Sequence, residues 1–151
     1  MKTYYLTLSK MFPKGHRNEG KPTNFEEKVK NGVKFHTIRA NYEFWRERFE
    51  KIEKGEACLS IRQWVGTPYG RGSTQREIAR LTKDDGIGLQ MLEFRYDNIY
   101  LPLIDDRCMY YPSEIAEKDG LSVEDWLDWF KGYDLSKPMA IIHFRNWRYN
   151  K

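Results

Sequence analysis

The stretch Asn31-Gly32-Val33-Lys34-Phe35-His36-Thr37-Ile38-Arg39 joins an amphipathic run to a strand-like run. Gly32 predicts the end of a helix, because glycine adopts the left-handed conformation that terminates helices without steric cost. Residues 35–38 are aromatic or β-branched apart from one histidine, and this composition favours a strand. The sequence therefore predicts a helix that passes directly into a strand.

The polar side chains of this stretch are the first candidate functional groups. Strand alternation places Thr37 and Arg39 on one face and His36 on the other, while Lys34 lies at the turn and can reach either face. Lys34, Thr37 and Arg39 could therefore line one polar site. A solvated lysine and arginine beside an ordinary strand, with a hydrogen-bonded histidine, would give the same pattern.

Residues on the amino-terminal side of this stretch predict a strand, a basic loop and a helix. Residues 4–8 alternate as a strand, and the following residues 10–23 contain Pro13, Gly15, Gly20 and Pro22, which are typical of a loop. Thr23 or Asn24 can cap a helix over residues 25–30.

Residues on the carboxyl-terminal side predict two longer helices within a series of strands. Asn41 caps a helix that buries Trp45, Phe49 and Ile52, and Ser122 caps a helix that buries Trp126 and Phe130. The pattern predicts helices over residues 42–53, 113–118 and 123–130, and strands over residues 57–64, 75–81, 89–95, 99–103 and 139–149. This order indicates an α+β fold.

Length and composition indicate one domain over residues 1–151. The chain is 40% hydrophobic and 15% aromatic, which is enough to bury one core. We expect that core to contain Leu59, Ile61, Ile78, Leu92, Phe94, Ile142 and Phe144. Cys58 and Cys108 lie in no metal-binding spacing and indicate reduced thiols, so no metal or cofactor is predicted. The sequence shows no signal peptide or apolar run of membrane length, and a cytoplasmic protein is expected.

The charge pattern fits an anionic partner, although a mild positive charge is also common in proteins that bind nothing charged. The net charge is +4, and basic residues concentrate in residues 10–34 and 62–80. Arg62 and Trp64 lie on the polar face of a predicted strand, and Arg71 lies in the glycine-rich loop of residues 65–74. These three side chains are candidate ligand contacts, together with Arg39 and His36. A flexible loop tip without a ligand would explain Arg71 equally.

Two motifs together resemble the ASCH family, which is similar to PUA domains. They are Gly32-x-Lys34-x-x-Thr37-Ile38-Arg39 and Ala116-Glu117-x-Asp119. The resemblance covers about residues 25–144. It implies a small PUA-like mixed β-barrel with covering helices, and a cleft that binds RNA, a nucleotide or a modified nucleoside.

One branch of that family comprises amidohydrolases that remove the acetyl group of N4-acetylcytidine with a lysine, a threonine and a glutamate. Lys34 and Thr37 match this pattern, and the acid position falls on Asp119, which is one methylene shorter than glutamate. A threonine hydroxyl becomes a nucleophile when a nearby base takes its proton, and a lysine is such a base when its pKa is lowered.

Three functions remain open at the level of sequence. The first is a domain that binds RNA or a nucleotide-like ligand, and the second is an amidohydrolase that acts on an N-acylated nucleoside. The third is an accessory or scaffold protein whose polar cluster is structural. The enzyme requires Lys34, Thr37 and Asp119 to converge in one pocket, whereas a binding module requires only a basic surface and a polar pocket.

Overall fold

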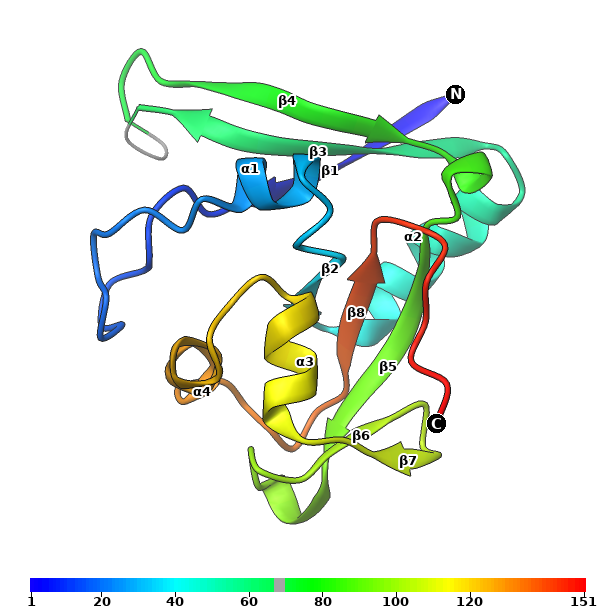
Figure 1. Ribbon diagram of the computed structural model, residues 1–151. Helices are drawn as coiled ribbons and strands as arrows, with labels where there is room; N and C mark the ends of the chain where they lie inside the picture. Colours follow the sequence, from blue (N-terminus) through cyan, green and yellow to red (C-terminus); the bar gives the residue numbers. More distant parts are fainter. Residues whose placement is uncertain (67–69) are drawn as a thin grey trace.

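The computed structural model describes residues 1–66 and 70–151 and shows a mixed α+β fold (Figure 1). The strands are β1 (Lys2–Leu8), β2 (His36–Ala40), β3 (Ala57–Val65), β4 (Thr74–Leu81), β5 (Gly88–Phe94), β6 (Pro102–Ile104), β7 (Cys108–Met109) and β8 (Met139–His143). The helices are α1 (Phe25–Lys30), α2 (Tyr42–Glu53), α3 (Pro112–Lys118) and α4 (Val123–Phe130), with 3-10 turns at Lys83–Asp85 and Arg95–Asp97.

The strands form two sheets. The first has the order β1-β3-β4, in which β1 runs parallel to β3. The second has the order β2-β8-β5-β6-β7, and its strands pair antiparallel. The first sheet crosses one end of the second in Figure 1. In the described residues the two sheets do not close into a barrel, so the structure supports the α+β class without the closed barrel that the resemblance implied.

Two hydrophobic clusters replace the single core expected from the sequence. Ile142 packs with Leu59 and Ile61 in the first cluster, whereas Ile141 packs with Leu92 and Trp126 in the second. Successive residues of a strand point to opposite faces, so β8, in the interior of the five-stranded sheet, contributes to both clusters. The expectation of one core was wrong because it assigned apolar residues to a core without regard to the face of the sheet.

The helices agree with the sequence prediction in position. Asn41 caps α2, since its side chain accepts a hydrogen bond from the backbone N–H of Phe44 at 3.3 Å. Ser122 caps α4 in the same way by accepting from Asp125. The cap of α1 differs: Asn24 occupies the N-cap position but its side chain caps nothing among the described residues, and Thr23 Oγ1 accepts from Phe25 N at 3.4 Å.

The carboxyl-terminal strand is shorter than predicted. β8 ends at His143, and residues 144–151 run back along the edge of the molecule toward β7 (Figure 1). Arg148 fixes the path of this tail, because its Nη2 donates to the carbonyl oxygen of Gly86 at 2.8 Å. A Cβ atom at Gly88 would lie 2.2 Å from the same Nη2, so a larger residue at that position would displace the Arg148 guanidinium from Gly86.

Candidate functional site

The candidate site is a small buried cavity, here called the Lys34 cavity. It lies where the end of β1, the helices α1 and α4, the strand β2 and the end of α3 meet. Its volume is about 10 Å³, which is room for one water molecule. Its lining residues are Leu8, Ser9, Phe25, Lys34, Thr37, Ile38, Arg39, Asp119, Leu121, Trp129 and Phe130.

Lys34 reaches this cavity because the chain turns sharply after α1. Gly32 has a φ of 69°, as expected for a residue that ends a helix, and the backbone N–H groups of Val33 and Lys34 both donate to Lys28 O. Phe35 N then donates to Lys118 O at 2.7 Å, which fixes the turn against α3. The turn directs Lys34 into the interior, where only 2% of the residue is exposed.

Lys34 forms a buried ion pair with Asp119. The Lys34 Nζ donates to Asp119 Oδ1 at 2.8 Å and to the backbone oxygen of Asp119 at 2.7 Å. The same nitrogen lies 4.1 Å from the centroid of the Phe25 ring, at a distance that permits a cation–π interaction. Three groups therefore hold the ammonium in one place.

Asp119 occupies this position because it caps the carboxyl end of α3. Its backbone N–H donates to Ile115 O at 3.0 Å, and the next residue, Gly120, has a φ of 75°. A Cβ atom at Gly120 would lie 3.1 Å from the Lys34 Cβ. Glycine therefore allows both the turn and the close approach of the two segments.

Burial and charge shift the pKa values of this pair. Burial lowers the pKa of Lys34 from its ordinary value more than the Asp119 carboxylate raises it, and the nearby Arg39 lowers it further. Burial alone would raise the pKa of Asp119, but Lys34 and His36 outweigh burial and hold that pKa below its ordinary value. The site thus combines an ionised acid with an amine that gives up its proton more easily than a surface lysine.

Thr37 lies in the cavity beside Arg39, as strand alternation predicted. Arg39 Nη1 donates to Thr37 Oγ1 at 3.2 Å, and Nη2 donates to the carbonyl oxygen of Thr7 at 2.6 Å. A guanidinium only donates hydrogen bonds, so the hydroxyl proton of Thr37 remains available to an acceptor. The structure therefore brings Lys34, Thr37, Arg39 and Asp119 together at one cavity.

The remaining predicted ligand contacts lie elsewhere. His36 is fully buried and contacts Asp119 without lining the cavity. The Arg62 guanidinium lies 4.4 Å from the centroid of the exposed Tyr5 ring, on the face of the first sheet opposite Ile61, and Trp64 follows on the same face. Arg71 is exposed in the turn before β4. The predicted loop of residues 65–74 lies partly outside the described residues, because it includes 67–69.

Two aromatic residues that complete the site were not predicted from the sequence. Trp129 lines the cavity, and the Tyr149 hydroxyl lies 2.7 Å from His36 Nε2. The sequence predicted a strand over residues 139–149 that would end at Tyr149. Local sequence carries no signal for either contact, since each joins segments that are far apart along the chain.

The loop of residues 9–24, here called the β1–α1 loop, covers Trp129. The rings of Phe12 and His16 pack against Trp129 with centroids 5.7 Å and 5.8 Å from it. His16 Nε2 lies 2.9 Å from the backbone oxygen of Asp125, and the Asn18 amide donates to the Asp125 carboxylate at 2.6 Å. The predicted basic loop is therefore fixed against α4.

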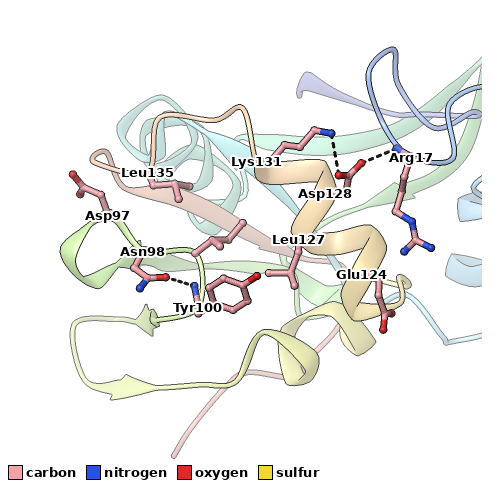
Figure 2. A pocket seen from close by; sticks show the side chains of 10 residues that line it. Arg17, Asp97, Asn98, Tyr100, Glu124, Leu127, Asp128, Lys131 and Leu135 are labelled. Atoms are coloured by element: carbon pink, nitrogen blue, oxygen red, sulfur yellow. Dashed lines mark hydrogen bonds and ion pairs between the residues drawn. The ribbon is translucent and has the colours of Figure 1, made fainter.

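A larger hollow of about 600 Å³ lies where the β1–α1 loop, α4 and the turn before β6 meet (Figure 2). There the backbone N–H of Arg17 donates to Asp128 at 2.7 Å, and Lys131 pairs with the same carboxylate at 3.0 Å. This hollow is open and shares no lining residue with the Lys34 cavity. Asp128 is already engaged by Arg17 and Lys131, and the hollow offers no comparable convergence of reactive groups.

The geometry of the site is the main evidence for its function, because comparisons with known proteins found no match. No family model, no curated protein and no solved structure matches this chain. Within residues 1–66 and 70–151, no three His, Cys, Asp or Glu side chains are grouped so that they could hold a metal ion. Every helix in this part of the chain is too short or too polar to cross a lipid bilayer.

Proposed function

We propose that this chain is an ASCH-type, PUA-like domain that hydrolyses the amide of a small N-acylated nucleoside such as N4-acetylcytidine. The observation that carries the proposal is that Lys34, Thr37 and Asp119 all line one buried cavity. These are the residues that the family resemblance assigns to catalysis. A binding module would not need a buried amine of lowered pKa beside a hydroxyl whose proton is available.

In the proposed reaction Lys34 is the general base and Thr37 is the nucleophile. The neutral Lys34 amine takes the proton from Thr37 Oγ1, and that oxygen attacks the acyl carbon of the substrate. Arg39 donates to Thr37 Oγ1 and favours the negative charge that develops there as the proton leaves. Burial lowers the pKa of the lysine and so favours its neutral form relative to a surface lysine.

Asp119 completes the reaction by guiding the proton. It accepts one N–H of Lys34 at 2.8 Å and so holds the ammonium in place while another of its protons passes to the leaving amine as the C–N bond breaks. A water molecule then attacks the acyl-threonine and gives a proton to Lys34. Lys34 returns that proton to Thr37 Oγ1 as the bond between this oxygen and the acyl carbon breaks, and the carboxylic acid leaves. Asp119 reaches Lys34 even though aspartate is one methylene shorter than the glutamate of the family pattern.

The substrate requires the cavity to open. A nucleoside needs a pocket of several hundred Å³, whereas the Lys34 cavity measures about 10 Å³. Trp129 and the β1–α1 loop are held against one another by ring contacts and by hydrogen bonds to α4. Because Trp129 and Ser9 line the cavity, we assign entry of the substrate to a movement of Trp129 and of this loop that breaks those contacts.

The test is to incubate the protein with N4-acetylcytidine and to follow the release of cytidine. We expect turnover by the wild type and none by Thr37→Ala, which removes the nucleophile. Lys34→Arg should also lose turnover, because arginine keeps the charge but stays protonated. Arg62→Ala is the matched control, since it removes a cation outside the cavity and should keep the wild-type rate.

Absence of turnover by the wild type with this and related acylated nucleosides would contradict the enzyme proposal. Binding of cytidine nucleotides or RNA under the same conditions would then favour the binding module. In that case Lys34→Arg should retain much of the affinity, because the charge on the ligand-holding group would be preserved. Lys34→Arg therefore distinguishes the two functions. An enzyme should lose turnover with this substitution, whereas a binding module should retain much of its affinity.

A further inference from the structure

His36 connects the candidate site to the carboxyl-terminal tail. Its Nδ1 lies 3.5 Å from Asp119 Oδ1, the oxygen that accepts from Lys34, and its Nε2 lies 2.7 Å from the Tyr149 hydroxyl. His36 is 0% exposed. Among the described residues Nδ1 has no partner at ordinary hydrogen-bond distance, so Asp119 is the group it faces.

The tautomer of His36 follows from its two neighbours. Burial raises the pKa of Tyr149 above its ordinary value and lowers that of His36, so the phenol keeps its proton and the imidazole is neutral. Donation of the Tyr149 hydroxyl to Nε2 would leave the single ring proton of His36 on Nδ1, the nitrogen that lies 3.5 Å from Asp119 Oδ1.

Tyr149 is held firmly enough to fix this arrangement. Its backbone N–H donates to Gln90 Oε1 and its carbonyl oxygen accepts from Gln90 Nε2, both at 2.8 Å. Its ring packs against Trp147 and Tyr110, with centroids 4.7 Å and 5.1 Å away. The tail therefore places the hydroxyl through contacts that are independent of the Lys34 cavity.

We propose that His36 and Tyr149 are positioning residues for the candidate site. Tyr149 fixes the His36 tautomer, and the Nδ1–H of His36 orients the Asp119 carboxylate so that Oδ1 accepts from Lys34. Neither residue lines the Lys34 cavity, and His36 reaches it only through Asp119. The kinetic part of this inference rests on the proposed amidohydrolase function, whereas the tautomer can be measured without a substrate.

The substrate-free test is a ¹⁵N NMR measurement of the histidine ring nitrogens. The chain has three histidines, so His16→Gln and His143→Gln variants assign the His36 signals. We expect the proton on Nδ1 in the wild type and a substantial share on Nε2 in Tyr149→Phe. Tyr110→Phe is the matched control, because it removes another buried phenol from the same cluster and should leave the tautomer unchanged. A wild-type proton on Nε2 would overturn the inference.

The kinetic test uses N4-acetylcytidine. We expect Tyr149→Phe to lower kcat several-fold with little change in KM, while Tyr110→Phe keeps the wild-type values. His36→Asn should retain more activity than His36→Leu, because the amide N–H of asparagine lies near the position of Nδ1. Turnover by the wild type with equal kcat for Tyr149→Phe would overturn the positioning role and leave the enzyme proposal intact. No turnover by the wild type would contradict the enzyme proposal. The NMR measurement of the His36 tautomer would then still test the positioning role of Tyr149.

Discussion

Two chains of polar and charged side chains in this protein differ mainly in the exposure of their charged groups to water. The buried polar chain consists of Lys34, Asp119, His36 and Tyr149. The outer-face chain lies on β3 and β4 and consists of Ser60, Arg62, Glu77 and Arg80. The side chains of Lys34 and Asp119 are 1% and 4% exposed, whereas those of Arg80 and Glu77 are 49% and 35% exposed.

The comparison shows why similar contacts support different roles. Water and salt screen the outer-face chain, so its charges interact weakly. In the interior, the same kinds of groups interact strongly and their pKa values move, but each depends on its partner. A reactive lysine is therefore expected in the buried polar chain.

The largest expected effect is on stability, through Asp119→Ala. This variant leaves the Lys34 ammonium buried without its counterion, and loss of one partner of a buried pair costs about 3–5 kcal/mol. Urea denaturation of the variant and the wild type measures the difference. Glu77→Ala on the outer face is the matched control and should change the midpoint far less. Equal losses for the two variants would show that burial does not distinguish the two chains.

A double variant distinguishes two causes of this loss of stability: the lost attraction between Lys34 and Asp119, and the buried charge left without its counterion. Lys34→Met combined with Asp119→Leu removes both charges, so it should be more stable than Asp119→Ala alone. Recovery should be incomplete, since the Asp119 carbonyl also loses the Lys34 ammonium that donates to it at 2.7 Å. A double variant no more stable than the single variant would contradict this explanation.

The next effect is the pH dependence of that difference in stability. The folded pKa of Asp119 lies below its ordinary value, so its contribution is present above the unfolded pKa and is lost as the pH falls through the folded pKa. The stability gap between the wild type and Asp119→Asn should therefore be largest near neutral pH and shrink in acid. Urea midpoints of both proteins across this range test the prediction. A gap that widens as the pH falls would contradict the shift.

Local sequence signals predicted the elements that surround the site, and failed where contacts are distant. Gly32 and Asn41 end and begin helices through their own backbone preferences, so the boundaries of α1 and α2 were predictable. The Lys34 and Thr37 spacing placed both residues near one turn. Tyr149 was not predictable, because it meets His36 across 113 residues and its position depends on the path of the tail.

The prediction of a single hydrophobic core was wrong for a similar reason. Hydrophobic residues mark a strand as buried, but they do not show whether one or both of its faces are covered. Ile141 and Ile142 are adjacent in sequence and both fully buried, yet they belong to different clusters. The sequence predicted the strand, whereas its partners on each face depend on how the two sheets are arranged.

A smaller effect concerns the β1–α1 loop, which helps to separate the buried polar chain from water. Asn18→Ala removes the hydrogen bond to Asp125 and should favour the open form of the loop. A hydrogen bond of about 1 kcal/mol corresponds to about a fivefold change in the open population, and KM for N4-acetylcytidine should fall by up to that factor. Asn98→Ala is the control, because the Asn98 side chain accepts a hydrogen bond from Tyr100 within its own turn. An unchanged or raised KM for Asn18→Ala would contradict the assignment of the loop.

The smallest effect on stability is expected for a substitution in the outer-face chain. Glu77 accepts hydrogen bonds from Ser60 and Arg80, and these contacts lower its pKa although it is exposed. Glu77→Gln keeps the shape of the side chain and removes only its charge. Because water already screens that charge, the urea midpoint should change slightly at low salt and not at all in 1 M salt, where the screening length is about 3 Å. The stability lost in Asp119→Asn should persist at high salt, since ions do not enter the buried site. If salt abolishes both differences equally, the two chains are screened alike and the Lys34 cavity is open to solvent.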